Sequence, residues 1–159
     1  YEIDVSLVGS EMCIRDSSIA LFKSTVWGSI QFGIDIDLVE NFRIKKIYDR
    51  YGNRFAKRIL DNEEIRDFNI SNDKVSFLAK RFASKEALSK SLGLGLYRKN
   101  LYPNKIRISH DDYGKPFFII DKTLSPLINE LEVTSIHLSI SDTSHYSTAI
   151  VITENNGSL

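Results

Sequence analysis

The stretch from Lys74 to Leu92 constrains the fold most, because it has the pattern of one long, uninterrupted helix. Asp73 before it is a favoured N-cap residue, and Gly93 after it is the residue type that most often closes a helix. At about 100° per residue, four side chains form one apolar stripe: Val75, Leu78, Ala79 and Phe82. A helix of this length with such a stripe predicts a packed domain built around it.

A carboxylate interrupts this stripe. Glu86 follows Phe82 by four residues and lies near its middle, with Lys90 four residues further on and Arg81 and Lys85 beside it. An ionised carboxylate in apolar surroundings is costly unless it is paired or bound to a metal. Two interpretations stay open: a Glu86–Lys90 surface pair at the rim of the core, or a carboxylate that faces a cleft for a divalent metal and phosphates.

The first regular pattern in the chain, from Gln31 to Leu38, alternates as a half-buried strand does. Asp37 ends this strand on the face opposite the aliphatic side chains, which makes it the best partner for Glu86. Asp35 shares that face, so the strand alone does not choose between the two aspartates. Mg²⁺ typically takes one or two protein carboxylates and leaves other positions to water and phosphate oxygens.

The remaining segments complete a mixed architecture. Helices are predicted over residues 39–51, 53–60, 63–68 and 123–131, and strands over residues 105–109, 116–120, 135–141 and 146–153. The last two strands form a C-terminal hairpin. We therefore predict an α+β fold, in which a largely antiparallel sheet packs against one long helix.

Length and composition fit one domain, since 159 residues with 42% hydrophobic side chains suffice for a single core. The longest charge-free stretch of the N-terminal part, Ser24 to Ile34, has 11 residues, whereas a membrane span needs about 20. We expect no membrane association. One cysteine, Cys13, suits a reducing cytoplasm, and one cysteine with three histidines makes a structural zinc site unexpected.

The N-terminus looks foreign to this pattern. Residues 31–154 form the predicted domain, residues 155–159 a tail and residues 1–30 an extension. Tyr1 to Ser17 resembles a translated sequencing-adapter read and continues into no helical or strand period. We expect deletion of Tyr1 to Ser17 to leave folding and activity unchanged. A large fall in melting temperature on deletion would contradict this.

Charge is distributed unevenly although the net charge is zero. Residues 40–58 and 74–99 are basic, and residues 61–73 between them are acidic. Basic segments suit an acidic or phosphate-rich partner, although ordinary solvated helix faces would give the same counts. A neutral chain has no broad footprint for nucleic acid, so no nucleic-acid partner is expected.

Five motifs occur in one order: GIDIDLVE (33–40), RFAKRIL (54–60), FLAKRFASKEALSKSLGLG (77–95), GKP (114–116) and HLSISDT (137–143). In this order they resemble the holo-acyl-carrier-protein synthase family, the small bacterial 4′-phosphopantetheinyl transferases, over about residues 31–154. The resemblance implies transfer of 4′-phosphopantetheine from coenzyme A to a serine of apo acyl carrier protein, with release of adenosine 3′,5′-bisphosphate, in fatty acid biosynthesis. It also implies a cytoplasmic homotrimer with sites between subunits.

The resemblance assigns roles residue by residue. It implies a Mg²⁺ cofactor held by Asp37 and Glu86, with Glu86 and Lys90 catalytic. The positions that match coenzyme contacts are Arg81, Lys85, Lys90, Gly93, Gly95, Lys115, His137 and Asp142. The positions that match the carrier-docking surface are Arg43, Arg50 and Arg54.

Two positions depart from the family pattern: Asp35 replaces a usual glycine, and Asp142 replaces a second histidine near the coenzyme phosphates. Asp142 would repel those phosphates, so Asp142→His is expected to raise the transfer rate about tenfold. The opposite expectation is that Asp142 serves as an extra metal ligand. Two other functions remain open: a catalytically weakened protein that only binds coenzyme A or carrier, and a metal-dependent nuclease.

Overall fold

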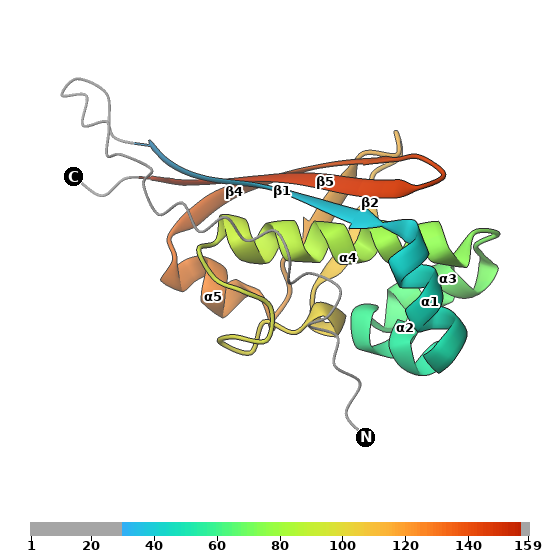
Figure 1. The fold of residues 1–159 in the computed structure, drawn as a ribbon. Coiled ribbons are helices and arrows are strands. Elements are labelled where there is room, and N and C mark those ends of the chain that lie inside the picture. Colours follow the sequence, from blue (N-terminus) through green and yellow to red (C-terminus); the bar gives the residue numbers. More distant parts are fainter. Residues whose placement is uncertain (1–29, 157–159) are drawn as a thin grey trace.

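The computed structural model describes residues 30–156, and these form the expected mixture of helices and antiparallel sheets (Figure 1). One sheet has three antiparallel strands in the order β1 (Ile30–Glu40), β5 (Tyr146–Asn156) and β4 (Val133–Asp142). A separate hairpin pairs β2 (Arg107–His110) with β3 (Pro116–Ile119). The α+β prediction is confirmed, as is the C-terminal hairpin. The suspect segment Tyr1 to Ser17 lies outside the described residues.

Helix α4 (Lys74–Ser91) is the centre of the molecule and lies against the three-stranded sheet (Figure 1). Its N-terminus is capped by the Asp73 carboxylate, which accepts a hydrogen bond from the Ser76 backbone N–H at 2.9 Å. At its C-terminus, Gly93 adopts a φ of +70° that favours glycine. Most side chains around the whole helix are buried, so α4 has neighbours on every side.

The shorter helices pack at the two ends of α4 (Figure 1). Near its N-terminal half lie α1 (Asn41–Tyr51), α2 (Asn53–Ile59) and α3 (Asn62–Ile70), and α5 (Ser125–Glu130) lies toward the other end. A 3₁₀ turn (Pro103–Lys105) leads into β2. Among the described residues, no helix has the length and apolar character that crossing a bilayer requires.

Several predicted boundaries differ from the observed ones, and the difference that changes β1 is at the start of the first helix. The helix expected from residue 39 begins at Asn41, because Val39 and Glu40 continue β1 and pair with Ser147 and Tyr146. The pairing of an edge strand with its neighbour outweighs the helical pattern of these two residues. Strand β1 therefore runs two residues past Leu38, where the sequence pattern placed its end.

The alternation of β1 is real, but its aliphatic face is not the one that packs on α4. Ile34, Ile36 and Leu38 are 56%, 60% and 61% exposed, whereas Asp37 is 8% exposed and faces the helix. Val39 is buried on the same side as Asp37. The inner face of β1 thus brings acidic side chains against α4, and its outer face presents aliphatic ones to the surroundings.

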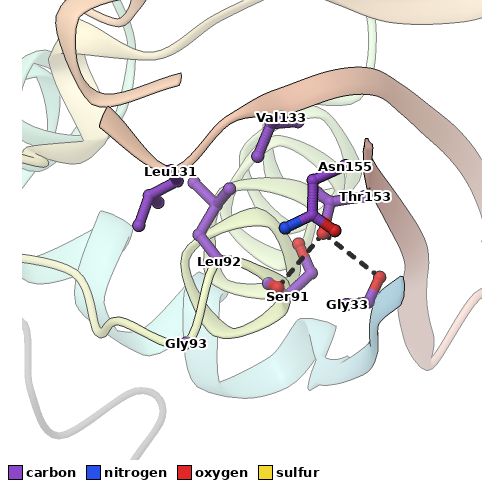
Figure 2. A pocket seen from close by; sticks show the side chains of 8 residues that line it. All are labelled: Gly33, Ser91, Leu92, Gly93, Leu131, Val133, Thr153 and Asn155. Atoms are coloured by element: carbon purple, nitrogen blue, oxygen red, sulfur yellow. Dashed lines mark hydrogen bonds between the residues drawn. The ribbon is translucent and has the colours of Figure 1, made fainter. Parts of the chain in front are cut away.

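Gly33 is where β1 approaches the end of α4 most closely. A Cβ atom added at Gly33 would lie 1.9 Å from the carbonyl oxygen of Ser91 and 2.4 Å from Thr153 Oγ1. Figure 2 shows Thr153 between the backbone carbonyls of Ser91 and Gly33. The Thr153 hydroxyl donates to the Ser91 carbonyl oxygen at 3.2 Å and to the Gly33 carbonyl oxygen at 3.3 Å. Only a residue without a side chain fits here.

We expect Gly33→Ala to destabilise the fold by about 3 kcal/mol and to lower the melting temperature by roughly 10 °C. The reason is the clash with the backbone of Ser91, which cannot move without displacing the end of α4. Circular dichroism melts measure the effect. Gly95→Ala is the matched control, since an added Cβ there meets only Arg98 Cδ at 4.0 Å. Equal melting temperatures for the two variants would contradict the prediction.

Candidate active site

The inner face of β1 and the C-terminal half of α4 bring the predicted carboxylates and lysine together. Lys90 Nζ donates a hydrogen bond to Asp37 Oδ1 at 2.8 Å, and both side chains are largely buried. The backbone carbonyl of Asp37 also accepts a hydrogen bond from Thr148 Oγ1 at 2.9 Å, which fixes β1 against β5. The strand register therefore selects Asp37 as the direct partner of Lys90.

Glu86 completes this centre from α4. Burial, reinforced by the negative charge of Asp37, raises the pKa of Glu86 to about 7, although Lys90 acts in the opposite direction. Burial would lower the pKa of Lys90, but the hydrogen bond and charge of Asp37 raise it overall. Lys90 therefore carries a positive charge beside a carboxylate that exchanges its proton near neutral pH.

Asp35 adds a third carboxylate to the neighbourhood. Its Oδ2 atom is buried and has no hydrogen-bond partner, and burial raises the pKa of its carboxyl group. Among the described residues, no three carboxylate, histidine or cysteine side chains gather closely enough to hold one ion by themselves. The two carboxylates of Asp37 and Glu86 have the chemistry of ligands for a hard cation such as Mg²⁺, which takes one or two protein carboxylates and leaves its other positions to water and phosphate oxygens.

A second group of predicted residues surrounds a separate cavity of about 250 Å³ between α4, the β2–β3 hairpin and β4. Its lining includes Arg81 and Asp142, together with two basic residues that the sequence analysis did not single out, Lys80 and His110. Gly114 and Pro116 line it as well, on either side of Lys115. The positive charges of Lys80 and Arg81 in this lining suit a phosphate group.

The partners of Asp142 change the expectation for this residue. Asp142 Oδ2 accepts a hydrogen bond from Ser76 Oγ at 2.8 Å and lies 3.4 Å from Lys80 Nζ. The repulsion argument did not include these two partners, which offset part of the Asp142 charge. A role as metal ligand beside Asp37 is also unsupported within one chain, because β5 separates β4 from β1 and two strand spacings amount to about 10 Å.

Because Ser76 and Lys80 already offset part of the Asp142 charge, we expect Asp142→His to change the transfer rate by less than about threefold. Steady-state rates for the two proteins at several coenzyme A concentrations measure this. A tenfold gain would restore the repulsion argument.

The coenzyme contact expected for Lys85 disagrees with the structure. Lys85 is 0% exposed, and its Nζ donates to Glu64 Oε2 at 2.5 Å and to the Ile59 carbonyl at 2.7 Å. Residues next to each other on a helix point in different directions, so Lys85 enters the core while Glu86 faces β1. Lys85 has a structural contact instead of a ligand contact.

The three loop positions have different surroundings. Gly93 lines a cavity of about 220 Å³ at the end of α4, together with Gly33, Ser91 and Leu92 (Figure 2). Gly95 lies in the following turn, where its carbonyl accepts a hydrogen bond from Arg98. Lys115 is exposed in the β2–β3 turn, and its backbone N–H donates to Asp111 Oδ1.

His137 does not join either group within one chain. It lies on the outer face of β4, where it is exposed and its Nε2 is 3.5 Å from Glu154 Oε1. The next residue, Leu138, packs inward instead. His137 therefore shares the outer face of the sheet with the exposed aliphatic side chains of β1.

The predicted docking arginines occupy α1 and the start of α2. Arg50 and Arg54 are exposed, Arg43 is half-buried, and the Arg50 guanidinium lies 5.2 Å from the Tyr51 ring centre. Other basic residues of α1 and α2 are exposed as well: Lys46, Lys57, Arg58 and Lys45, of which Lys45 pairs with Asp49 at 2.5 Å.

Comparisons with known proteins agree with this architecture. The family model described as the 4′-phosphopantetheinyl transferase superfamily matches residues 31–151. A holo-[acyl-carrier-protein] synthase of Wigglesworthia glossinidia brevipalpis is 45% identical over 129 residues, which are 78% of this chain and 92% of that protein.

Two solved structures have the same fold. The crystal structure of holo-[acyl-carrier-protein] synthase from Neisseria meningitidis has a TM-score of 0.74 and 38% identity, covering 77% of this chain and 98% of that one. The Helicobacter pylori synthase in complex with coenzyme A has a TM-score of 0.66 and 32% identity, covering 76% and 98%. With its family model, relatives and fold in agreement, the chain belongs to the 4′-phosphopantetheinyl transferase superfamily.

Proposed function

We propose that the centre formed by Asp37, Glu86 and Lys90 transfers 4′-phosphopantetheine from coenzyme A to a serine of apo acyl carrier protein. The other product is adenosine 3′,5′-bisphosphate. The observation that carries this proposal is the juxtaposition of Asp37 and Lys90, at 2.8 Å, beside Glu86 in a chain of this superfamily. The relatives that resemble it are holo-[acyl-carrier-protein] synthases, and one of them is solved with coenzyme A.

Each residue of the centre has a chemical task. Glu86 accepts the proton of the carrier serine hydroxyl as that oxygen attacks the phosphate, which is the work of a general base. Lys90 lies beside Glu86 and neutralises negative charge that develops on the phosphate oxygens. Asp37 holds the Lys90 ammonium in place through their hydrogen bond. Asp37 and Glu86 would hold Mg²⁺, which supplies further stabilisation of phosphate charge when bound.

The cavity beside Arg81 supplies a second anchoring point for the coenzyme. Arg81 and Lys80 contribute fixed positive charge to its lining, and such groups bind phosphate oxygens through charge-assisted hydrogen bonds. The Gly93 turn and Lys115 are the remaining candidate contacts near these two regions. Binding energy from phosphates remote from the reacting atom positions that atom for transfer.

The carrier is proposed to dock on α1 and α2. The exposed basic residues there, among them Arg50 and Arg54, suit an acidic partner, because complementary charge speeds encounter and fixes orientation. Arg43 lies on α1 with Arg50. The resemblance to holo-[acyl-carrier-protein] synthases leads us to place the reaction in fatty acid biosynthesis and in the cytoplasm.

The assembly we propose is a homotrimer that covers the outer face of the sheet. This face presents five large apolar side chains that are at least 37% exposed: Ile34, Ile36, Leu38, Tyr146 and Ile150. A continuous apolar face of this kind marks an interface. His137 lies on the same face, so only an assembly would bring it to a neighbouring site. Sedimentation equilibrium distinguishes a trimer from a single chain of 18.2 kDa.

The function is tested by following adenosine 3′,5′-bisphosphate with chromatography. We expect its release only when the enzyme, Mg²⁺, coenzyme A and apo carrier are all present. Coenzyme binding without release would favour a weakened binding protein. Cleavage of DNA in place of release would favour a metal-dependent nuclease.

A further inference from the structure

We propose that Glu64 is a positioning residue for coenzyme binding, because its buried carboxylate holds both walls of the cavity that Arg81 lines. This inference rests on the proposed function and adds a residue to which the sequence motifs assign no role. Glu64 belongs to α3 and is 1% exposed, and a buried carboxylate persists only where paired groups surround it.

Four groups converge on this carboxylate: two from α4, one from β2 and one from the N-cap of its own helix. Its Oε1 atom accepts a hydrogen bond from the Ile108 N–H at 3.1 Å and lies 3.4 Å from Arg81 Nε. Its Oε2 atom accepts from Lys85 Nζ at 2.5 Å and from the Asp61 N–H at 3.0 Å. The Asp61 contact belongs to the capping box that begins α3, so Glu64 is fixed by its own helix as well.

The Oε1 contacts reach the two opposing walls of the cavity. Arg81 lines the cavity from α4, next to Lys80. Ile108 lies in β2, two residues before His110, which lines the other wall. A single oxygen atom therefore fixes the position of β2 relative to the Arg81 guanidinium, and the spacing of the walls depends on it.

The orientation of Arg81 depends on Glu64 in the same way. Nε lies 3.4 Å from Glu64 Oε1 in an ion pair and makes no hydrogen bond within the described part of the chain, so charge attraction holds this side of the guanidinium and leaves the terminal nitrogens for an anion in the cavity. Stacking over Phe77, with 4.9 Å between the guanidinium carbon and the ring centre, fixes the plane of the group. Burial lowers the pKa of Arg81, and the Glu64 charge counteracts that effect.

Replacing Lys85 together with Glu64 separates the positioning role of Glu64 from its contribution to the stability of the fold. The Glu64→Gln variant alone would leave the Lys85 ammonium buried without its counterion, at a cost of several kcal/mol. The double variant Glu64→Gln/Lys85→Met replaces the whole pair with uncharged side chains of similar volume, which proteins often tolerate. Its reference is Lys85→Met, in which the buried Glu64 carboxylate keeps Arg81 as its counterion at 3.4 Å. Melting curves check that this reference is folded before affinities are compared.

The experiment measures coenzyme A affinity by calorimetry, and kcat and KM with apo carrier, for both proteins. Relative to Lys85→Met, the double variant is expected to bind coenzyme A about tenfold more weakly, with kcat changed by less than about threefold. The same comparison is then made with Arg81→Ala present in both proteins. Glu64→Gln is expected to cause no further loss of coenzyme A affinity there, since the residue to be positioned is absent.

Two results would overturn the proposal. The first is equal coenzyme A affinity in the double variant and its reference. The second is the same loss of affinity with and without Arg81, which a purely structural role of Glu64 would give. Glu64→Asp, which retracts the charge by one methylene, replaces the double variant if melting curves show that the latter is unfolded, and the same outcomes decide. A natural chain that neither binds coenzyme A nor modifies carrier would refute the proposed function instead.

Discussion

We expect Glu86→Gln to lower the transfer rate by about 10³-fold and to leave the fold intact. The substitution keeps the size of the side chain but removes the charge that a metal and a serine proton both require. Glu86 lies between α4 and β1 beside Asp37 and Lys90, so its effect is on chemistry. Rates of carrier modification measure the loss, and Glu63→Gln, an exposed position on α3, is the control.

The same variant is expected to be more stable than the natural chain in alkaline, metal-free buffer. Burial raises the pKa of Glu86 from 4.5 to about 7 in the folded state. The folded chain therefore binds a proton more tightly than the unfolded chain, and stability falls as the pH rises from about 4.5 to about 7. The uncharged amide of the Glu86→Gln variant avoids this loss of stability. In the natural chain the loss amounts to at most about 3 kcal/mol above pH 7.

Thermal melts at pH 5 and pH 8 in the presence of a chelator measure this difference. The melting temperature of Glu86→Gln should exceed that of the natural chain at pH 8, and the gap should nearly close at pH 5. A gap that is the same at both pH values would mean that Glu86 does not exchange its proton in this range.

Asp37→Asn is the second variant with a large expected effect, again about 10³-fold on transfer. It weakens the hydrogen bond that holds Lys90 at 2.8 Å and removes one of the two carboxylates that fit a divalent cation. Asp35→Asn is the matched control on the same face of β1, and we expect it to lower transfer by less than about tenfold. The reverse order would mean that Asp35 is the essential carboxylate.

Binding of Mn²⁺, measured by electron paramagnetic resonance, gives a readout that is independent of transfer. Asp37→Asn should weaken Mn²⁺ binding strongly and Asp35→Asn only modestly. Unchanged Mn²⁺ binding in Asp37→Asn would separate this residue from the metal, although its bond to Lys90 would still stand.

Local sequence patterns predicted the elements of this fold well. Asp73 and Gly93 mark the two ends of α4, because capping chemistry acts within one helical turn. The alternation of β1 and the C-terminal hairpin are equally local. The extra two residues of β1 could not be foreseen, since their strand conformation depends on pairing with β5, more than 100 residues later in the sequence.

The direction in which a side chain points was harder to predict than the element that carries it. Nothing in the alternation of β1 tells which face packs on α4, and the aliphatic face turned out to be the outer one. Lys85 and Glu86 are adjacent in sequence and matched adjacent family positions, but only Glu86 reaches the centre beside Asp37. Helical rotation separates them, and it takes the packed structure to show which is buried.

The residues that the sequence analysis missed are those whose importance arises from distant partners. Ser76 and Lys80 gain significance only because β4 brings Asp142 to them. Glu64 stands in a recognisable capping box with Asp61, but that pattern does not reveal that its carboxylate also contacts α4 and β2. Such contacts depend on tertiary packing and leave no spacing in the sequence.

The central claim is that the centre between β1 and α4 performs the transfer. Its most direct test is the intact mass of apo carrier after incubation with coenzyme A, Mg²⁺ and either the natural chain, Asp37→Asn or Glu86→Gln. We predict that the natural chain adds one phosphopantetheine to the carrier and that neither variant does so in the same time, although both fold. Modification by both variants at the natural rate would contradict the claim and place the reaction elsewhere in the molecule.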